Sequence, residues 1–583
     1  MILDRINGPK DLKTLNAAER KELAQEIRQA MLKRVSIHGG HFGPDFGIVE
    51  ATIALHTVFD SPKDKIVWDV SHQVYPHKIL TGRKQAYLEE EHYDDVSGYS
   101  NPAESEHDFF EVGHTSTSIS LASGLAMARD LRGGHENIIA VIGDGSMSGG
   151  EALEGLDTVG EMGTNMIIVL NDNQMSIAEV HGGMYKGFEE LRRTGGKSEH
   201  NLFRAMGLDY RFVADGNDSE VLIKVFREVK DIDHPVVVHI ATQKGKGYKF
   251  AEENKESWHW HMPFDIETGE VKQPYVDEAA ELTASYLLDR LKTDKKLAIL
   301  TAATPASFGF TPERRKQAGK QFIDVGIAEE QAVAMASGLA KGGARPVFGD
   351  YATFFQRTYD QISQDVCINN NPAVFLVFGA SMYSMNDVTH LCIFDIPMMA
   401  NIPNLVYLAP VSLAEYKAML AWALDQTDHP VAIRVPVLPV SSEGRTIRTD
   451  YSQLNTYEVT RRGEEVAILG LGNFYGLAEQ TAAELEKKGI HATIINPTYI
   501  TGLDTDLLES LKKDHRLVVT MEDGVLDGGF GEKIARFYGS SDMKTYAFGL
   551  EKKFYDRYDY EKLAEAFNLK PELAAKKILE LIK

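Results

Sequence analysis

The stretch from residue 138 to residue 177 constrains the fold more than any other part of the chain. It opens with an apolar run over residues 138–142 and contains a second one over residues 166–170, with one helix-length segment between them. Apolar runs of this length are typical of buried parallel strands, and a strand, a helix and a strand in this order form a βαβ unit. The sequence therefore predicts an α/β chain built on parallel sheets.

Polar residues follow both predicted strands. Gly143-Asp144-Gly145 comes directly after the first strand, and Asn171-Asp172-Asn173 comes after the second. The carboxyl ends of neighbouring parallel strands meet at one edge of the sheet, where ligands of such sheets bind. Mg²⁺ prefers hard oxygen ligands that it shares with phosphate groups, and glycine lets a phosphate approach the backbone. A tight turn would explain the first cluster alone, but the pair predicts a site for a magnesium-bound diphosphate.

Length and composition narrow the class of protein. The chain of 583 residues is too long for one core and corresponds to roughly three or four domains of about 150 residues. Its net charge of -23 disfavours nucleic acid and anionic membranes as partners, because neutralising phosphates requires clustered Lys and Arg. The chain has two cysteines, no signal-peptide pattern and no apolar run of about 18 residues. We therefore expect a soluble protein of a reducing, cytoplasmic compartment.

Three histidine-bearing loops precede the Gly143-Asp144-Gly145 cluster. Residues 38–44 (HGGHFGP) follow a predicted helix over residues 16–35, and residues 68–78 (WDVSHQVYPHK) follow a predicted strand over residues 65–67. Residues 113–118 (GHTSTS) open an Ala- and Gly-rich helix, whose N-terminus offers unpaired N–H groups to an anion. A single loop histidine is more often structural, but three such loops before one sheet edge indicate a single pocket.

Taken together, the motifs resemble those of the 1-deoxy-D-xylulose-5-phosphate synthases within the transketolase superfamily. The chain contains, in order, GGHFG, WDVSHQVYPHKILTGR, GHTSTSIS, GDG with LNDNQMSI, FIDVGIAEE and YATFFQRTYDQ. The resemblance implies a transferase of aldehyde or ketone residues that depends on thiamine diphosphate and Mg²⁺. Its reaction would condense pyruvate with glyceraldehyde 3-phosphate and release CO₂, in isoprenoid and thiamine biosynthesis.

The resemblance also implies an architecture. It predicts three doubly wound, parallel-sheet α/β domains of the transketolase type in a homodimer. These are a diphosphate-binding domain over residues 1–290, a pyrimidine-binding domain over residues 291–445 and a transketolase C-terminal domain over residues 446–583.

Individual residues receive roles from the same resemblance. Glu329, within FIDVGIAE, would share a proton with the aminopyrimidine ring of the cofactor. The other expected catalytic residues are His41, His390 and His259, the last favoured over His261 by its spacing to residues 263–265. The expected metal ligands are Asp144, Asn173 and Met175. The expected cofactor-binding residues are His72, His114, Ser116, Gly143, Gly145, Ser146, Asn173, Lys244, Glu329, Phe354 and Arg357. The expected substrate contacts are Tyr351, Asn386, His390 and Arg434.

The acceptor end departs from the family pattern. With Thr389-His390 aligned, the arginine of the family's DRAGxxGADGxTH motif becomes Gly379 and its second aspartate becomes Asn386, while the arginine of YPRG becomes Val437. The resemblance implies that the two arginines grip the acceptor phosphate, and each charge-assisted bond of this kind is worth about 1.5–3 kcal/mol. Residues 181–206 also form a polar connection that is shorter than the corresponding segment of the family. Any lid that this segment supplies in the family would therefore be altered here.

Three interpretations stay open at this point. The chain is a working synthase whose acceptor phosphate is held by other cations, with Arg434 or Arg357 as candidates. Alternatively, it is a related ketol or acyl transferase with a different, unphosphorylated acceptor. The third interpretation is a cofactor-binding scaffold without turnover, which the retention of Asp144, Asn173 and Glu329 disfavours.

Overall fold

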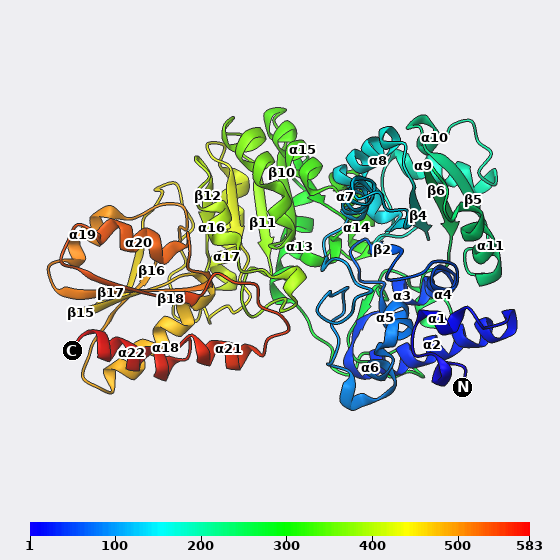
Figure 1. Ribbon diagram of the computed structural model, residues 1–583. Helices are drawn as coiled ribbons and strands as arrows, with labels where there is room; N and C mark the ends of the chain where they lie inside the picture. The colour runs from blue at the N-terminus through cyan, green and yellow to red at the C-terminus, as the bar shows by residue number, and fades with distance from the viewer. The chain divides into compact units, whose positions relative to one another are not determined.

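Three larger sheets organise the chain, which the computed structural model describes over residues 1–583 (Figure 1). The chain divides into unit 1, Met1–Tyr275 with Gly326–Ala328, and unit 2, Val276–Val325 with Glu329–Lys583. Each of the three predicted domain ranges contains one of the larger sheets. The predicted α/β class with parallel sheets is confirmed, while the domain boundaries stay predictions.

Unit 1 contains a five-stranded parallel sheet in the order β2-β3-β4-β6-β5. Its strands are β2 (Lys65–Trp68), β3 (Ile138–Gly143), β4 (Met166–Asp172), β6 (Pro235–Ala241) and β5 (Asp209–Val213). Alternate strand residues face two separate apolar cores. One core includes α4 (Val49–Val58) and α11 (Ser219–Val229), and the other includes α7 (Ser118–Leu131) and α8 (Gly150–Met162). The predicted βαβ unit is therefore β3-α8-β4, and its two strands are neighbours in the interior of this sheet.

The segment over residues 181–206 differs from the polar connection that the sequence predicted. It contains α9 (Gly183–Arg193) and α10 (Leu202–Ala205). Phe188 and Leu191 of α9 are buried and pack into the core beside α8. These side chains form one narrow apolar stripe along the helix. Because lysine, glutamate and arginine residues occupy the rest of its surface, the segment looked uniformly polar in the sequence.

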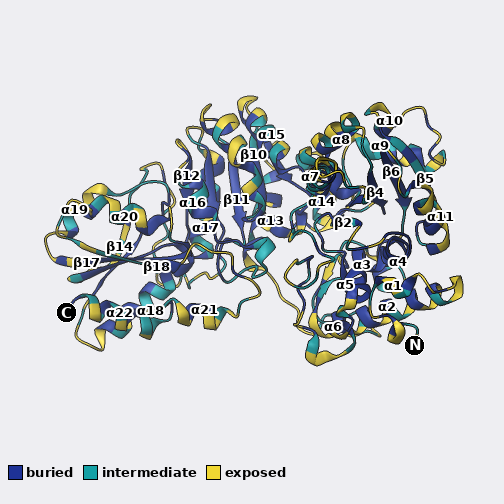
Figure 2. Ribbon diagram, in the orientation of Figure 1, coloured by how far each residue is buried: buried dark blue, intermediate teal, exposed yellow.

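Unit 2 begins with a six-stranded parallel sheet in the order β12-β13-β11-β10-β8-β9. Its strands are β12 (Val406–Leu408), β13 (Val431–Arg434), β11 (Val374–Phe378), β10 (Arg345–Tyr351), β8 (Leu297–Thr301) and β9 (Phe322–Asp324). Helix α15 (Glu329–Lys341) packs on one face, and α13 (Glu278–Leu291) and α17 (Leu413–Asp425) pack on the other. Figure 2 shows these strands mostly buried and the outer sides of the helices exposed.

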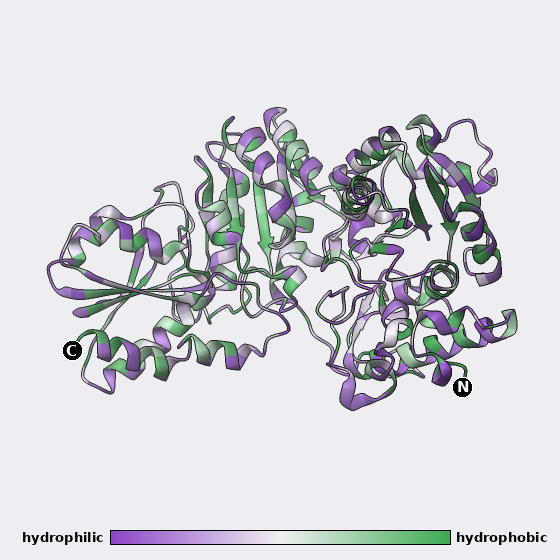
Figure 3. Cartoon of the chain, viewed as in Figure 1, coloured by the Kyte–Doolittle hydropathy of each residue, from purple (hydrophilic) through white to green (hydrophobic).

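The third sheet has the order β14-β16-β15-β17-β18, and only its edge strand β14 runs antiparallel to its neighbour. The strands are β14 (Glu458–Arg461), β16 (Thr493–Asn496), β15 (Glu465–Gly470), β17 (His515–Val525) and β18 (Lys544–Leu550). Helices α18 (Tyr475–Glu486) and α22 (Pro571–Leu581) cover one face. On the other face, α19 (Thr505–Leu511) and α20 (Phe530–Tyr538) share one apolar core with the second sheet. In Figure 3 the helices mix hydrophilic and hydrophobic residues, and none is long and apolar enough to cross a membrane.

Candidate active site

Asp144 begins the turn that follows β3, as the sequence predicted. Its carboxylate accepts hydrogen bonds from the backbone N–H of Gly145 at 3.0 Å and of Gln174 at 2.7 Å. Burial, together with the neighbouring Asp172, raises the pKa of Asp144 well above its ordinary value. Negative charge is therefore in excess at this sheet edge, and a cation bound there would stabilise the ionised carboxylate.

The Asn171-Asp172-Asn173 cluster lies beside Asp144, where the backbone N–H of Gln174 donates to Asp144 Oδ2 at 2.7 Å and to Asp172 Oδ1 at 3.2 Å. The carboxylate of Asp172 accepts a hydrogen bond from His239 Nε2 of β6 at 2.8 Å and pairs with Arg192 of α9. These two partners lower the pKa of Asp172, although burial opposes them. The side-chain oxygen of Asn173 accepts a hydrogen bond from Met175 N–H at 3.1 Å.

Helix α9 supports this edge in a way that the sequence did not reveal. The hydroxyl of Tyr185 donates a hydrogen bond to the backbone oxygen of Asp144 at 3.0 Å, and Arg192, in the last turn of the helix, neutralises Asp172. The shortened segment therefore holds both polar clusters from one side. In the sequence, only the amphipathic pattern of residues 183–193 could have indicated this helix.

The loop before α7 is pinned by Asp69, a residue that the sequence did not single out. Asp69 is fully buried and accepts hydrogen bonds from Ser116 N–H at 2.8 Å and Ser118 N–H at 3.0 Å. Ser116 in turn donates from its hydroxyl to the backbone oxygen of Ser146 at 2.7 Å. These contacts join the loop that carries the half-buried His114 to the Gly143-Asp144-Gly145 turn, and so bring the predicted diphosphate-binding residues together.

The loop that carries His72 is strained and braced. Val70 and Ser71 have φ of 58° and 59°, a conformation that costs non-glycine residues about 1–3 kcal/mol each. Ser71 donates from its hydroxyl to the backbone oxygen of Val112 at 2.6 Å and accepts a hydrogen bond from Ser100 N–H at 3.0 Å. These bonds hold the strained backbone that presents His72.

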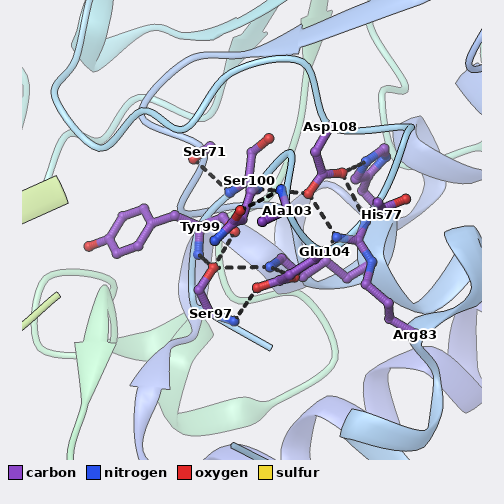
Figure 4. A network of polar contacts seen from close by, with 12 residues as sticks. Ser71, His77, Arg83, Ser97, Tyr99, Ser100, Ala103, Glu104 and Asp108 are labelled. Atoms are coloured by element: carbon purple, nitrogen blue, oxygen red, sulfur yellow. Dashed lines mark hydrogen bonds and ion pairs between the residues drawn. The ribbon is translucent and has the colours of Figure 1, made fainter. Parts of the chain in front are cut away.

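Beneath this loop lies a buried network of charged side chains (Figure 4). Asp108 accepts hydrogen bonds from His77 Nε2 at 2.9 Å and from both terminal nitrogens of Arg83 at 2.7 and 2.9 Å. Arg83 also contacts Glu104 at 3.2 Å, and Glu104 pairs with Lys78 at 2.5 Å. His77, Lys78 and Arg83 of the WDVSHQVYPHKILTGR motif therefore anchor the loop over residues 97–108.

Three histidines form a cluster in unit 1. The ring centroids of His41 and His72 lie 5.0 Å apart, those of His72 and His259 lie 5.1 Å apart, and those of His41 and His259 lie 5.9 Å apart. The short ribbon of β1 (Gly40–His41) and β7 (Trp260–His261) brings the first and last of them together. Gly40 is required in this ribbon, because a Cβ atom there would lie 2.6 Å from the hydroxyl of Tyr75.

The cluster distinguishes His259 from His261. His261 stacks on Trp258 with ring centroids 3.9 Å apart and packs against Phe264, outside the cluster. His259 Nδ1 lies 3.1 Å from Lys244 Nζ, which also donates to the backbone oxygen of Ser176 at 2.6 Å. His259, and not His261, therefore belongs to the histidine cluster, while its catalytic role stays a prediction.

The surroundings of His72 and His259 keep these two rings neutral. Burial and the nearby Lys244 lower the pKa of His72 to about 3, and burial, Lys244 and the other two histidines lower the pKa of His259 well below its ordinary value. Burial also lowers the pKa of Lys244 to about 7. Neutral imidazoles can donate or accept a proton, which suits them to contact a substrate.

Unit 2 supplies a second group of predicted site residues around Glu329. This residue begins α15, is 3% exposed and has no hydrogen-bond partner for its Oε2 atom. Arg357 Nη1 lies 3.9 Å from that oxygen. Burial raises the pKa of Glu329 to about 7, although Arg357 opposes the shift. The side chain therefore holds a proton near neutral pH.

The aromatic residues predicted for the site lie in the same region of unit 2. The ring of Phe354 lies 6.2 Å from that of Tyr351 and 5.7 Å from that of His390, centroid to centroid. His390 Nδ1 lies 2.7 Å from the hydroxyl of Thr389, which itself donates to Asp387 at 2.6 Å. The structure therefore brings Tyr351, Phe354 and His390 together.

Arg434 requires a correction. Its side chain is buried between two carboxylates, with Nε 2.8 Å from Asp395 Oδ2 and Nη1 paired with Asp523. A guanidinium held in this way neutralises the protein's own acids and is inaccessible to a substrate phosphate, so the expected role as a phosphate ligand is wrong. The sequence could not reveal this, because both partners are far from Arg434 along the chain.

The Asn386 side chain also hydrogen-bonds within the protein. Its Nδ2 donates to the backbone oxygen of Tyr558 at 2.9 Å, and its own backbone oxygen accepts from Arg557 N–H at 2.7 Å. These bonds attach the acceptor loop to the segment after β18. The substrate contact expected for Asn386 stays a prediction beside this structural one.

The two positions where the family carries arginines contact neutral groups. Gly379 has φ of 66°, and a Cβ atom there would lie 2.8 Å from Ser384 Oγ and 3.3 Å from the ring of Tyr351. Val437 is half-buried, and its N–H donates to Asn473 Oδ1 at 2.8 Å. A hydroxyl and an aromatic ring thus lie nearest to Gly379, and a side-chain amide oxygen binds the backbone of Val437.

Comparison with known proteins supports one family. The model of 1-deoxy-D-xylulose-5-phosphate synthase matches residues 3–198 and 194–242. The models of the transketolase pyrimidine-binding and C-terminal domains match residues 280–440 and 455–572. The two pieces of the first match meet directly after α9, where the sequence indicated a shortened segment.

Curated relatives cover the whole chain. The 1-deoxy-D-xylulose-5-phosphate synthase of Clostridium beijerinckii is 36% identical over 622 residues, covering 100% of this chain and 99% of the relative. The synthase of Desulfitobacterium hafniense is 38% identical over 594 residues, covering 96% and 94%. The solved transketolase of Campylobacter jejuni covers 97% of this chain and 100% of its own at 17% identity and a TM-score of 0.43, so the family assignment depends on the sequence relatives. By full-length identity and domain content, the chain belongs to the 1-deoxy-D-xylulose-5-phosphate synthase family, transferases of aldehyde or ketone residues within the transketolase superfamily.

Proposed function

We propose that this protein is a thiamine diphosphate- and Mg²⁺-dependent carboligase with 1-deoxy-D-xylulose-5-phosphate synthase activity, which takes pyruvate as donor and an aldehyde as acceptor. The observation that carries the proposal is Glu329, a buried glutamate whose pKa is raised to about 7 at the start of α15. General acid–base catalysis at neutral pH needs a group with such a pKa. The full-length relatives named as synthases support the same reading.

The residues of unit 1 fit a magnesium-bound diphosphate. Asp144, Asn173 and the backbone oxygen of Met175 are hard oxygen donors, and Asp144 is buried where a cation would offset its charge. A Cβ atom at Gly143 would meet nothing within 4 Å, which leaves room for a phosphate, and Ser176 Oγ is buried without a hydrogen-bond partner beside Gly145. His72, His114, Ser116, Ser146 and Lys244 would complete the diphosphate site.

The protein's own groups supply binding and proton transfer. Thiamine diphosphate, when bound, supplies a carbon nucleophile and an electron sink. Glu329 holds a proton near neutral pH and can exchange it with a ring nitrogen of the cofactor, while Phe354 offers an aromatic face to the ring. The neutral rings of His72 and His259, with His41 beside them, can donate hydrogen bonds to the donor substrate or accept a proton from it.

A second candidate function differs in the acceptor. Gly379 and Val437 stand where the family carries phosphate-binding arginines, and Arg434 is occupied by Asp395 and Asp523. A dianion placed among neutral groups loses hydration without compensation. These observations favour a related ketol or acyl transferase whose acceptor lacks a phosphate, with Arg357 as the remaining candidate cation for a phosphorylated one.

One experiment separates the three functions that the sequence left open. The protein is incubated with pyruvate, thiamine diphosphate, Mg²⁺ and a panel of phosphorylated and unphosphorylated aldehydes, and the products are identified by mass. Release of CO₂ with 1-deoxyxylulose 5-phosphate supports the synthase, and a product formed only from unphosphorylated aldehydes supports the second function. A protein that binds the cofactor and releases no CO₂ contradicts both and would be a scaffold.

The family resemblance further supports a homodimer in the cytoplasm, without nucleic-acid or membrane partners. Light scattering of the purified protein tests the dimer, because a mass near twice 64.8 kDa is expected.

A further inference from the structure

Two carboxylates stand at the carboxyl ends of β3 and β4 and share one backbone donor. The N–H of Gln174 donates to Asp144 Oδ2 at 2.7 Å and to Asp172 Oδ1 at 3.2 Å. Oxygens that accept from one N–H lie within about 6 Å of each other. Both side chains are almost fully buried. A cation held by Asp144 would therefore lie within reach of the charge of Asp172, unless another group neutralises that charge.

The other oxygen of Asp172 already has two partners. Arg192 of α9 pairs with Oδ2, and His239 Nε2 of β6 lies 2.8 Å from the same atom. The second ring nitrogen of His239 lies 2.8 Å from the hydroxyl of Tyr210, so the ring is held from both sides. A guanidinium does not give up its proton in proteins, so Arg192 supplies a permanent counter-charge. The hydrogen bonds that Asp144 accepts come from backbone N–H groups, which carry no net charge.

Helix α9 is docked so that Arg192 reaches this edge. Tyr185, Phe188 and Arg192 recur at the i, i+3, i+7 spacing that places side chains on one face of a helix. Phe188 is buried, with its ring centroid 5.6 Å from that of His239, and the Tyr185 hydroxyl donates to the backbone oxygen of Asp144 at 3.0 Å. These two contacts fix the helix independently of the Arg192 side chain, which is 20% exposed. Arg192 can therefore be replaced while the helix stays in place.

The charge that a cation meets at this edge depends on Arg192. The proposed metal ligands are the Asp144 carboxylate, the Asn173 side-chain oxygen and the backbone oxygen of Met175, of which only the first is anionic. Mg²⁺ requires octahedral oxygen coordination and usually takes part of it from phosphate groups. An ionised Asp172 without its counter-charge would attract a cation in the absence of phosphate and would repel a diphosphate.

We propose that Arg192 is a positioning residue of the metal site: by holding and neutralising Asp172, it makes a divalent cation bind together with a diphosphate rather than alone. Arg192 contacts neither the cation nor the diphosphate in this role. The inference rests on the proposed function, because it takes Asp144 as the metal ligand. The control is exerted from α9, the helix of the segment that is shorter here than in the family.

Two binding measurements on the full-length protein without cofactor, at low ionic strength, test the proposal. Electron paramagnetic resonance follows Mn²⁺ alone, and calorimetry follows inorganic pyrophosphate in the presence of Mg²⁺. The Mn²⁺ that remains bound when Asp144→Ala is added to each protein is subtracted as surface binding. In Arg192→Met, Mn²⁺ should bind at least about tenfold more tightly, because even at the dielectric constant of water a unit charge about 6 Å from a divalent cation has that effect. Pyrophosphate should bind more weakly in the same variant.

The opposite signs separate this role from a purely structural one, since a disordered site would bind both ligands more weakly. Arg192→Lys keeps the charge and should keep both affinities. Arg193→Met is the matched control, because it removes the same charge from an exposed position next to Arg192 on the helix, where solvent and salt screen it. Asp172→Asn should weaken Mn²⁺ binding and strengthen pyrophosphate binding, which tests the proposal even if Arg192→Met does not fold. Combining Asp172→Asn with Arg192→Met should restore both affinities.

The outcomes that overturn the proposal are specific. Affinities in Arg192→Met that fall together, stay unchanged or match those of Arg193→Met refute the role of Arg192, and so does an Asp172→Asn variant that binds both ligands as the unmodified protein does. If the unmodified protein binds no Mn²⁺ even with pyrophosphate, or if Asp144→Ala binds as much, the metal site of the proposed function fails together with the inference. If that control succeeds, only the inference is at stake, because neither measurement requires turnover.

Discussion

Replacing Arg434 by methionine should destabilise unit 2 far more than replacing a surface arginine. The Arg434 side chain is 1% exposed, and both partner carboxylates, Asp395 and Asp523, are fully buried. Methionine preserves most of the apolar stem and removes the charge. Asp395 then keeps only the hydroxyl of Tyr407 at 2.6 Å, and Asp523 keeps the amide of Asn473 at 2.8 Å.

The expected loss follows from that geometry. Breaking a buried ion pair by removing one partner costs about 3–5 kcal/mol, because it leaves uncompensated buried charge. Here one guanidinium serves two acids, so we expect a loss at the upper end of that range. Arg516→Met is the matched control: Arg516 is 56% exposed and pairs with the exposed Glu465 at 2.9 Å, so its loss should cost no more than about 1 kcal/mol.

Urea unfolding measured by fluorescence reports the result. Trp422 is the only tryptophan of unit 2, so the signal that disappears in Trp422→Phe follows that unit. In a background with Asp395→Asn and Asp523→Asn, Arg434→Met should cost much less, because no carboxylates remain to compensate. The reasoning is refuted if Arg434→Met matches Arg516→Met in stability and instead raises KM for glyceraldehyde 3-phosphate alone, which would restore Arg434 as a phosphate ligand.

Four further outcomes are expected. Asp144→Ala should abolish Mg²⁺-dependent binding of thiamine diphosphate while the fold survives, because the ion loses its anionic protein ligand; unchanged affinity by calorimetry would remove Asp144 from the site. Glu329→Gln should bind the cofactor and slow hydrogen–deuterium exchange at its thiazolium carbon by orders of magnitude, and exchange at the parental rate would exclude the assigned role. Val437→Arg should lower KM for glyceraldehyde 3-phosphate and leave KM for glyceraldehyde unchanged; Gly379→Arg is less suitable, because the φ of 66° at Gly379 would strain an arginine. The loss of the phosphate site is refuted if kcat/KM of the unmodified protein is already a hundredfold higher for the phosphorylated aldehyde, a difference of roughly 2.7 kcal/mol. Burial raises the pKa of Glu415 to about 7, so the free energy of unfolding of the unmodified protein should fall by up to roughly 3 kcal/mol as the pH rises from 4.5 to 7. Glu415→Gln should not show this fall, and parallel pH profiles of urea unfolding for the two proteins would contradict the prediction.

The sequence by itself determined the elements and the sheet edges. Runs such as residues 138–142 and 166–170 specify buried strands because side-chain period and apolarity are local properties. The polar residues that follow them then fall at the carboxyl ends of parallel strands, whatever the rest of the chain does. For this reason Asp144 and Asn173 came together as predicted, and the family motifs located Glu329, Tyr351 and Phe354 in a common region.

Only the tertiary structure decided which polar groups are available. Arg434 carries the same charge in the sequence whether it binds a phosphate or bridges Asp395 and Asp523, which lie 39 and 89 residues away. The same applies to His259, which the β1–β7 ribbon brings to His41 while His261 stacks on Trp258. Availability depends on burial and on partners from distant segments, and no local pattern encodes either, because packing brings those segments together only in the folded chain.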